Sequence, residues 1–319
     1  MSFMTSVVLL CVITACVCAF PGSLLVIRKQ SMLVEAMSHA VLPGIVIGVL
    51  VSRRTNSVWM IFFASLMGLI VVIGAEKFRQ TGLITSDSSQ GILFPFLFSV
   101  GIILLSTVLS SVHVCEDTVL TGDINLMALQ TEHLILNGID YGPRTMWHLL
   151  AVLALDAIYV TVFWRVLKLA TFDPTLARTM GFPVNAVNLG LMTLVSLTVV
   201  VAFSVAGAIL VVALMIVPPA AAAVFAHRFS SLMIMSQVFA IASALIGFLT
   251  ANVFTLSTAP MMAFVNGILF LVVLIIHNLR RHRRKFASQI SDESALAIPE
   301  IAERAELTDT PERELAFVK

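Results

Sequence analysis

The residues best suited to chemistry are an acidic side chain and a histidine, Glu35 and His39, which lie inside an apolar stretch. Four residues on a helix correspond to about 400°, so the two side chains project from nearly the same face. A carboxylate beside an imidazole is half of a divalent-metal site. A charge inside a bilayer costs about 2.5–3.5 kcal/mol on insertion scales, so it normally faces a partner, a cavity or an ion. The pair is therefore the first candidate site.

Two interpretations of this pair remain open. It is either a hydrogen-bonded brace that fixes helix packing or a pair of metal ligands. Pro43 lacks the backbone N–H that would bond the His39 carbonyl, and Gly44 permits close approach of another helix. One Glu and one His are too few to hold a metal, but two copies related by a twofold axis supply four ligands. The metal interpretation therefore predicts a dimer as well.

Asp156 is a second ionisable residue inside an apolar segment, and a further candidate metal ligand. The alternative is a hydrogen bond to a neighbouring Ser, Thr or Asn. The sequence contains no P-loop, no H-E-x-x-H and no G-x-S-x-G motif, which argues against an enzyme. Transport against a gradient would then draw its energy from a partner chain or an ion gradient. The sequence contains no basic patch interleaved with aromatic residues, so nothing in it suggests nucleic-acid binding.

The elements that must position these residues are helices in a membrane. Hydrophobic residues make up 59% of the 319 and charged residues only 12%, with a mean hydropathy of +1.02. A soluble domain is about 25% charged, so the chain is expected to be an all-α, polytopic integral membrane protein surrounded by lipid. Runs of about 20 apolar residues predict about nine spanning helices, with eight or ten as alternatives. They are placed near 4–27, 31–52, 57–75, 91–112, 146–165, 186–204, 206–226, 232–253 and 260–279.

The sixth and seventh of these helices come from one apolar stretch, and a break is predicted at Ser204 to Gly207. Lys and Arg occupy alternate connections, which predicts an outside N-terminus and a cytoplasmic C-terminus. Arg53 and Arg54 are the exception to this pattern. Residues 1–279 are expected to form the transmembrane domain, and residues 280–319, which are polar and acidic after a basic cluster, a cytoplasmic tail.

A short helix outside the membrane is predicted between Thr171 and Pro183, on the cytoplasmic side. Asp173 suits the N-cap, Pro174 suits the first helical position, and Gly181 suits the residue just past the end. Such a helix is either a simple connector or the element that a partner protein grips to move the bundle.

The sequence resembles the permease subunits of bacterial ABC-type metal-uptake transporters, the zinc, manganese and iron family. The stretch V-E-A-M-S-H-A-V-L-P-G at Val34–Gly44 is similar to the family's G-D-A-x-S-H-A-V-L-P-G. Two further matches are D-P-T-L-A-R-T-M-G-F at Asp173–Phe182 and V-A-G-A-I-L-V-V-A-L-M-I-V-P-P-A-A-A at Val205–Ala222. The resemblance covers most of Ser31–Asn266.

The resemblance implies a multi-pass permease of the bacterial inner membrane that is not itself an enzyme. Its implied partners are cytoplasmic ATP-binding subunits, an extracytoplasmic metal-binding protein and a second permease protomer, identical or paralogous. Manganese, zinc or iron would be the cargo, with no permanently bound cofactor. The family's metal ligands map to Glu35 and His39, and its coupling region to the segment containing Asp173, Pro174, Ala177 and Gly181. Glu35 departs from the family, which usually has Asp there, and the loop near 127–144 looks longer than usual.

Two rival functions are kept. A gradient-driven secondary transporter would use Glu35, His39 and Asp156 as a proton relay and would need no ATPase. A structural or assembly subunit would use the Glu–His pair as an internal brace, and replacing His39 by Gln would then spare uptake.

Overall fold

The computed structural model describes residues 3–52, 58–80, 86–108, 122–129, 133–136 and 139–280. The chain divides after Phe270 into two units, Met1–Phe270 and Leu271–Lys319. Of the second unit, residues 271–280 are described, as the end of a helix that begins at Thr258. The predicted cytoplasmic tail lies outside the described residues beyond Arg280, as do Arg53 and Arg54 and, in the loop near 127–144, residues 130–132 and 137–138.

The described chain is built from long apolar helices. Seven of them are long and apolar enough to cross a membrane: α1 (Phe3–Ile27), α2 (Met32–Ser52), α3 (Val58–Gln80), α7 (Arg144–Val162), α10 (Val184–Phe225), α11 (Phe229–Phe254) and the last helix, Thr258–Arg280. A further helix, α4 (Ser86–Val108), has a shorter apolar part, Gly91–Thr107. The expected polytopic all-α architecture is confirmed.

α10 contains 42 residues, and the chain reverses direction inside it. A straight helix would separate Asn188 from Met215 by about 40 Å. Both nevertheless lie against the end of α1, because Arg28 hydrogen-bonds Asn188 and Gly22 packs directly on the backbone of Met215. The reversal lies at Gly207, with φ 76° and ψ 164°, a conformation that glycine adopts readily. The predicted break is confirmed, and with α4 the two arms of α10 bring the described passages to the expected nine.

The fifth predicted helix, 146–165, is wrong at its C-terminal end. α7 ends at Val162, and a separate helix, α8 (Trp164–Phe172), begins after a turn at Phe163. In α8 the side chains of Arg165 and Lys168 are exposed while Leu167 is fully buried. This amphipathic pattern is typical of a helix on a membrane surface, and hydropathy alone extended the predicted helix three residues past the end of α7, into the start of α8. α9 (Pro174–Thr179) follows.

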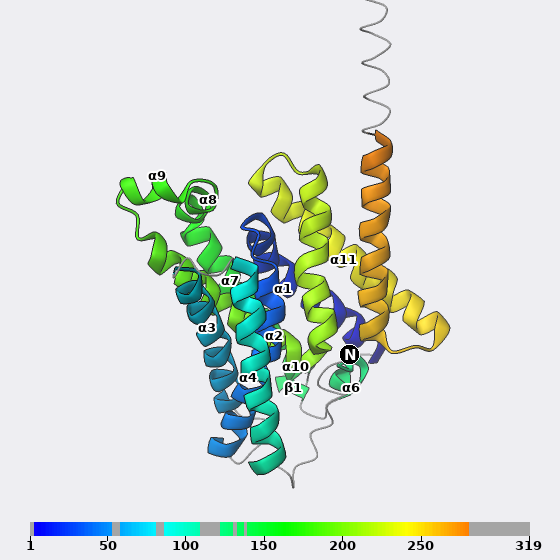
Figure 1. The fold of residues 1–319 in the computed structure, drawn as a ribbon. Helices are drawn as coiled ribbons and strands as arrows, with labels where there is room; N and C mark the ends of the chain where they lie inside the picture. Colours follow the sequence, from blue (N-terminus) through cyan, green and yellow to red (C-terminus); the bar gives the residue numbers. More distant parts are fainter. Residues whose placement is uncertain are drawn as a thin grey trace, which may run out of the picture. The chain divides into compact units, whose positions relative to one another are not determined.

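Small elements lie at the opposite end of the bundle from α8 and α9 (Figure 1). α6 (Ile124–Ala128) begins at Asp123, and a two-stranded antiparallel hairpin pairs β1 (His133–Leu136) with β2 (Ile139–Pro143). The hairpin is a minor addition to the all-α expectation. Gly122, which precedes α6, lies so close to the backbone of Ala206 and Gly207 that an added Cβ would be 2.3 Å from Ala206. α6 therefore covers the reversal of α10.

One apolar core joins buried residues of α1, α2, α7, α10 and α11. α1 packs against α7, α10 and α11, and Gln237 and Ser236 of α11 donate hydrogen bonds to backbone carbonyls of α1. α2 packs most extensively against α3 and α4 (Figure 1). The helix that carries Glu35 and His39 is therefore supported by α3, by α4 and by the core.

Candidate functional site

Glu35 and His39 lie in the first and second turns of α2, on a side of that helix that is accessible in the part of the chain that the structure describes. Glu35 is exposed and His39 is half-buried, while residues 36–38 between them are buried. Leu42 and Val49 continue the same accessible face. Their spacing along the helix, at i, i+4, i+7 and i+14, places them on the same side of α2, where Val46 at i+11 is buried. We call these four residues, Glu35, His39, Leu42 and Val49, the open stripe.

The position of the pair along α2 is closer to one membrane face than the sequence suggested. The first helical residue is Met32, so Glu35 lies about 4.5 Å and His39 about 10 Å along the axis. The preceding turn contains Arg28, whose guanidinium Nε donates a 3.0 Å hydrogen bond to Thr171 Oγ1 at the end of α8. The pair therefore lies toward the α8–α9 end of α2.

The imidazole of His39 is held by aromatic side chains of α4. Its ring stacks on Phe94 at a centroid distance of 5.2 Å and meets the edge of Phe98 at 5.4 Å. Below it, Pro43 faces α4 as well, and a Cβ on Gly101 would lie 2.8 Å from the Pro43 Cδ. α4 thus fixes the ring before any ligand arrives, which lowers the ordering cost of binding.

Glycine lets α3 support the opposite side of α2. A Cβ on Gly44 would lie 2.5 Å from the Cα of Ala64, and one on Gly48 would lie equally close to the Cα of Met60. The close helix approach predicted at Gly44 is therefore confirmed. α3 is in turn fixed to α10, since the hydroxyl of Ser196 donates a 2.8 Å hydrogen bond to the Ser65 carbonyl.

Asp156 has a different environment from Glu35. It is 2% exposed, on the side of α7 that faces α10. The hydroxyl of Thr198 on α10 donates a 2.8 Å hydrogen bond to its Oδ2. A neighbouring hydroxyl is the alternative that the sequence left open for this residue. Within the described ranges, no three His, Cys, Asp or Glu residues gather closely enough to hold a metal ion.

The predicted short helix is present as α9, with the predicted caps. Asp173 accepts hydrogen bonds from the backbone N–H groups of Thr175 at 3.1 Å and Leu176 at 2.9 Å, and Pro174 occupies the first turn. Gly181 follows the end of the helix with φ +80°, the left-handed conformation that glycine favours. Ala177 is fully buried, so it fixes α9 to the rest of the chain.

Large apolar side chains are exposed around α9, outside the spanning helices, next to polar ones such as Thr175 and Arg178. The exposed apolar side chains are Phe172, Leu176, Met180 and Phe182, each between 39% and 63% exposed. Apolar groups that gather on a surface outside the spanning helices are typical of a protein interface.

Sequence reasoning missed the residues that connect α9 to α2. Besides Thr171, the guanidinium of Arg28 donates a hydrogen bond to the side-chain oxygen of Asn188 near the start of α10. Tyr159 donates a 2.7 Å hydrogen bond to the carbonyl of Val187, the residue before Asn188. These contacts join residues more than 25 positions apart, so no local sequence pattern announces them.

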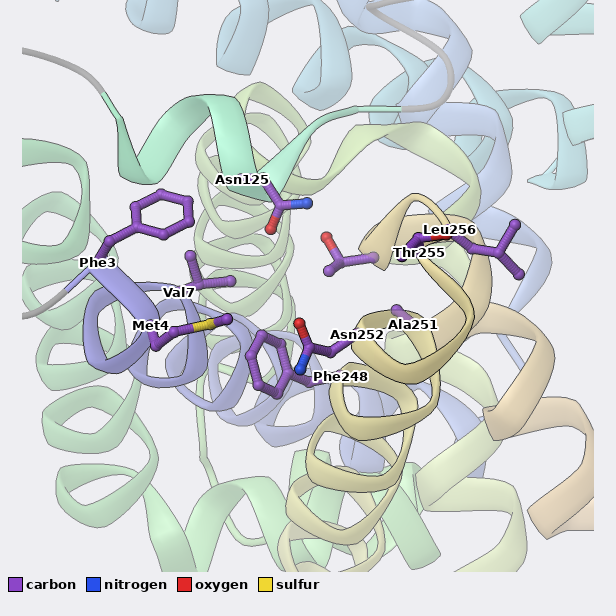
Figure 2. Close-up of a pocket in the computed structure, with 10 residues that line it drawn as sticks. Phe3, Met4, Val7, Asn125, Phe248, Ala251, Asn252, Thr255 and Leu256 are labelled. Carbon is purple, nitrogen blue, oxygen red and sulfur yellow. The ribbon is translucent and has the colours of Figure 1, made fainter.

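A pocket of about 300 Å³ lies at the other end of α1, between its first residues, α6 and the end of α11. Figure 2 shows Met4, Phe248 and Asn252 pointing into it, with Asn125 of α6 opposite. None of the residues predicted for metal binding or coupling lines this pocket.

Comparison with known proteins identifies a family that matches this chain. Residues 1–277 match the ABC 3 transport family. The manganese transport system membrane protein MntD of Bacillus subtilis is 34% identical over 270 residues, which is 85% of this chain and 90% of that protein. The zinc transport system membrane protein TroD of Treponema pallidum is 36% identical over 269 residues, 84% of this chain and 72% of that protein.

A solved structure shares the fold. PsaBC from Streptococcus pneumoniae in complex with Fab superimposes with a TM-score of 0.70 at 25% sequence identity, covering 86% of this chain and 91% of that one. The similarity spans almost all of the described helices, so it concerns the whole membrane bundle and not one motif.

Proposed function

Because the chain belongs to the ABC 3 transport family, as the membrane permease subunit of a metal-uptake transporter, we propose that it forms half of a divalent-cation path. A second permease, identical or paralogous, forms the other half. ATP-binding subunits on the cytoplasmic side supply the energy, and an extracytoplasmic metal-binding protein delivers manganese, zinc or iron. With this sidedness the C-terminus lies in the cytoplasm of the bacterium.

The open stripe is the observation that carries this proposal. A side chain that its own chain leaves uncovered in a membrane faces lipid, water or another protein, and contact of a carboxylate with hydrocarbon is costly. Glu35 is exposed, so the favourable neighbour is protein or water. When two permeases meet along this stripe, two Glu and two His converge, which is a plausible ligand set for a divalent ion.

The single chain offers no complete site, which also supports a shared one. In the part of the chain that the structure describes, His, Cys, Asp and Glu form no group of three. The same observation disfavours the proton relay, because Asp156 does not join Glu35 and His39 in such a group. Asp156 has its hydrogen-bonding partner, Thr198, within the same chain. The chemistry of the pair is therefore assigned to cation passage and not to proton relay.

The proposed ligands, Glu35 and His39, do not by themselves select among manganese, zinc and iron. MntD is named for manganese and TroD for zinc, and both are comparably similar to this chain. Carboxylate oxygen suits Mn²⁺ and imidazole suits Zn²⁺ and Fe²⁺, so a Glu–His pair is compatible with all three. Glu35 carries one methylene more than the Asp usual in the family, which moves its oxygens relative to the ring of His39.

α9 is the proposed contact for the ATP-binding subunits. It is capped at both ends, held through Ala177, and surrounded by exposed apolar side chains outside the spanning helices. A rigid element of this kind passes on the displacement of a bound partner, whereas a flexible loop would absorb it.

Uptake into proteoliposomes tests the proposal. Vesicles contain the chain with its ATP-binding and delivery proteins, and radiolabelled manganese, zinc and iron are supplied with or without ATP. ATP-dependent uptake of one or more metals is expected for the wild type. Loss of a direct ligand should cost at least the roughly 10–100-fold typical of an outer ligand partner, so Glu35→Gln and His39→Gln should each reduce uptake by that factor or more.

Val51→Ala is the matched control, because it shortens an exposed side chain of the same helix that lies outside the open stripe. It should retain most of the uptake. If both ligand variants assemble and transport like the wild type, Glu35 and His39 are a structural brace and the proposal fails. Uptake by the chain without ATP-binding subunits would instead support a gradient-driven transporter.

A further inference from the structure

Arg28 connects three elements that are far apart in the sequence. Its Nε donates a hydrogen bond to Thr171 Oγ1 at 3.0 Å, and its Nη1 donates one to the Asn188 side-chain oxygen. The Thr171 hydroxyl donates in turn to the Leu167 carbonyl one turn earlier in α8, at 2.6 Å. The guanidinium thus bridges the α1–α2 turn, the end of α8 and the start of α10.

The geometry of these bonds depends on an arginine. Both acceptors, Thr171 Oγ1 and the Asn188 side-chain oxygen, are neutral, and a planar guanidinium can reach two such acceptors at once, whereas an ammonium is a single point charge. Burial lowers the pKa of Arg28 to about 10, so the side chain still carries its proton at neutral pH. The bridge is therefore charged and directional under ordinary conditions.

The turn that carries Arg28 is short and well ordered. Lys29 adopts φ 57°, and the N–H groups of Lys29 and Gln30 donate to the carbonyls of Val26 and Leu25 respectively, which forms a Schellman motif at the end of α1. A left-handed residue other than glycine costs about 1–2 kcal/mol, and such strain is found where surrounding contacts impose it. The turn therefore behaves as a stiff connection.

On one side this connection leads directly to Glu35. α2 begins at Met32, and its first hydrogen bonds run from Leu33 N to Gln30 O and from Val34 N to Ser31 O. Glu35 is the next residue of the same turn. A displacement of the α1–α2 turn is therefore passed to the carboxylate of the open stripe over a single turn of helix.

On the other side the bridge leads to α9. Thr171 is two residues before Asp173, the N-cap of α9. Asn188 follows Val187, whose carbonyl is held by Tyr159 of α7, and a Cβ on Gly190 would lie 2.5 Å from the Tyr159 hydroxyl. Arg28 therefore spans the joint between α8–α9 and a firmly anchored start of α10.

We propose that Arg28 is a positioning residue that passes movement of α8 and α9 to the first turn of α2, and so to Glu35. The inference rests on the proposed function, in which α9 receives the movement and Glu35 holds the ion. In this proposal one side chain, that of Arg28, links ATP hydrolysis on the ATP-binding subunits to opening of the ion site.

The test is the number of metal ions imported per ATP hydrolysed, measured together in proteoliposomes that hold the complete transporter. Arg28→Met keeps the length of the side chain and removes both donors, and it should lower this ratio about fivefold or more. Thr171→Val removes one acceptor with little change in shape and should lower the ratio less. Because both variants break the same bridge, the double variant should lose little more than Arg28→Met alone.

Lys29→Met is the matched control, since it removes a neighbouring positive charge from an exposed side chain in the same turn. It should leave the ratio unchanged, and Arg28→Lys should restore only part of it. The proposal is overturned if uptake and hydrolysis fall together with the amount of assembled Arg28→Met complex, because that is the outcome for a merely stabilising residue. An unchanged ratio in the assembled Thr171→Val transporter would overturn it even if Arg28→Met failed to fold.

The two proposals fail in different ways. If the wild-type transporter imports no metal with ATP, the proposed function is wrong. If the wild type imports metal and Glu35→Gln abolishes import, but the ratio survives in the Arg28 and Thr171 variants, only the role of Arg28 is wrong.

Discussion

Glu35 and Asp156 are both acidic residues on apolar helices, but their surroundings differ. Asp156 is 2% exposed and accepts a hydrogen bond from Thr198 of the same chain. Glu35 is exposed on the open stripe, beside an imidazole that α4 already holds in place. A group satisfied internally needs nothing further, whereas an uncovered carboxylate in a membrane needs a second protein or an ion. In the proposed function, this contrast places Asp156 in the fold and Glu35 at the interface.

The largest effect is expected from disturbing the support of the open stripe. In Gly44→Ala the added methyl group meets the backbone of Ala64 at 2.5 Å, so α2 and α3 must separate. Such overpacking typically costs about 1–3 kcal/mol, and uptake should fall as Glu35 and His39 move. Thermal unfolding and uptake are measured together.

Gly91→Ala on α4 is the control for this change, because a Cβ there has no atom within 4 Å. It should be neutral or slightly stabilising, since alanine is favoured over glycine in a helix. Full uptake and stability in Gly44→Ala would show that the position of α2 is not set by its contact with α3.

Breaking the Asp156 hydrogen bond should lower the stability of the protein without lowering its metal uptake. Thr198→Val leaves a buried carboxylate without its donor, which costs about 1–3 kcal/mol of unfolding free energy. Metal uptake per folded transporter should stay close to that of the wild type. Thr193→Val on the same arm of α10 is the control, because Thr193 is exposed and bonds only the carbonyl one turn before it. A loss of uptake without a loss of stability would return Asp156 to the ion path.

A smaller effect is expected at Asp173, an acidic residue that is exposed but accepts hydrogen bonds from the backbone of α9. Asp173→Ala removes the cap of α9, and loss of such a cap typically costs about 1 kcal/mol, local to that helix. Binding of the ATP-binding subunits should weaken, while metal binding at Glu35 should not change. Thr175→Ala is the control on the same exposed turn. Binding assays with the purified subunits distinguish the two residues, and equal weakening by both would contradict a specific role for the cap.

Much of this organisation was predictable because it is local. The reversal at Gly207, the caps at Asp173 and Gly181, and the apolar passages follow from glycine geometry, capping chemistry and hydropathy. The end of α7 was misplaced because α8 continues the apolar composition while changing its periodicity. The hairpin was also missed, because two very short strands show too little hydrophobic periodicity to be predicted.

The sequence predicts the residues of the candidate site, and their role stays a prediction, but it does not predict the surroundings of these residues. The residue types and spacing of Glu35 and His39 indicate a metal, yet the stacking on Phe94 and Phe98 joins segments that no local pattern relates. The accessibility of the open stripe depends on how α3, α4 and the core cover the other faces of α2. The bridge through Arg28 depends on the reversal of α10, which brings Asn188 beside the end of α1.

The central claim is that two permeases share one ion between their open stripes. Equilibrium binding of radiolabelled metal to the purified transporter, with its permease content measured independently, tests it most directly. One ion for every two permease chains is expected, and His39→Gln should abolish the binding while Asp156→Asn retains it. One ion for each chain, or unchanged binding to His39→Gln, would contradict the shared site.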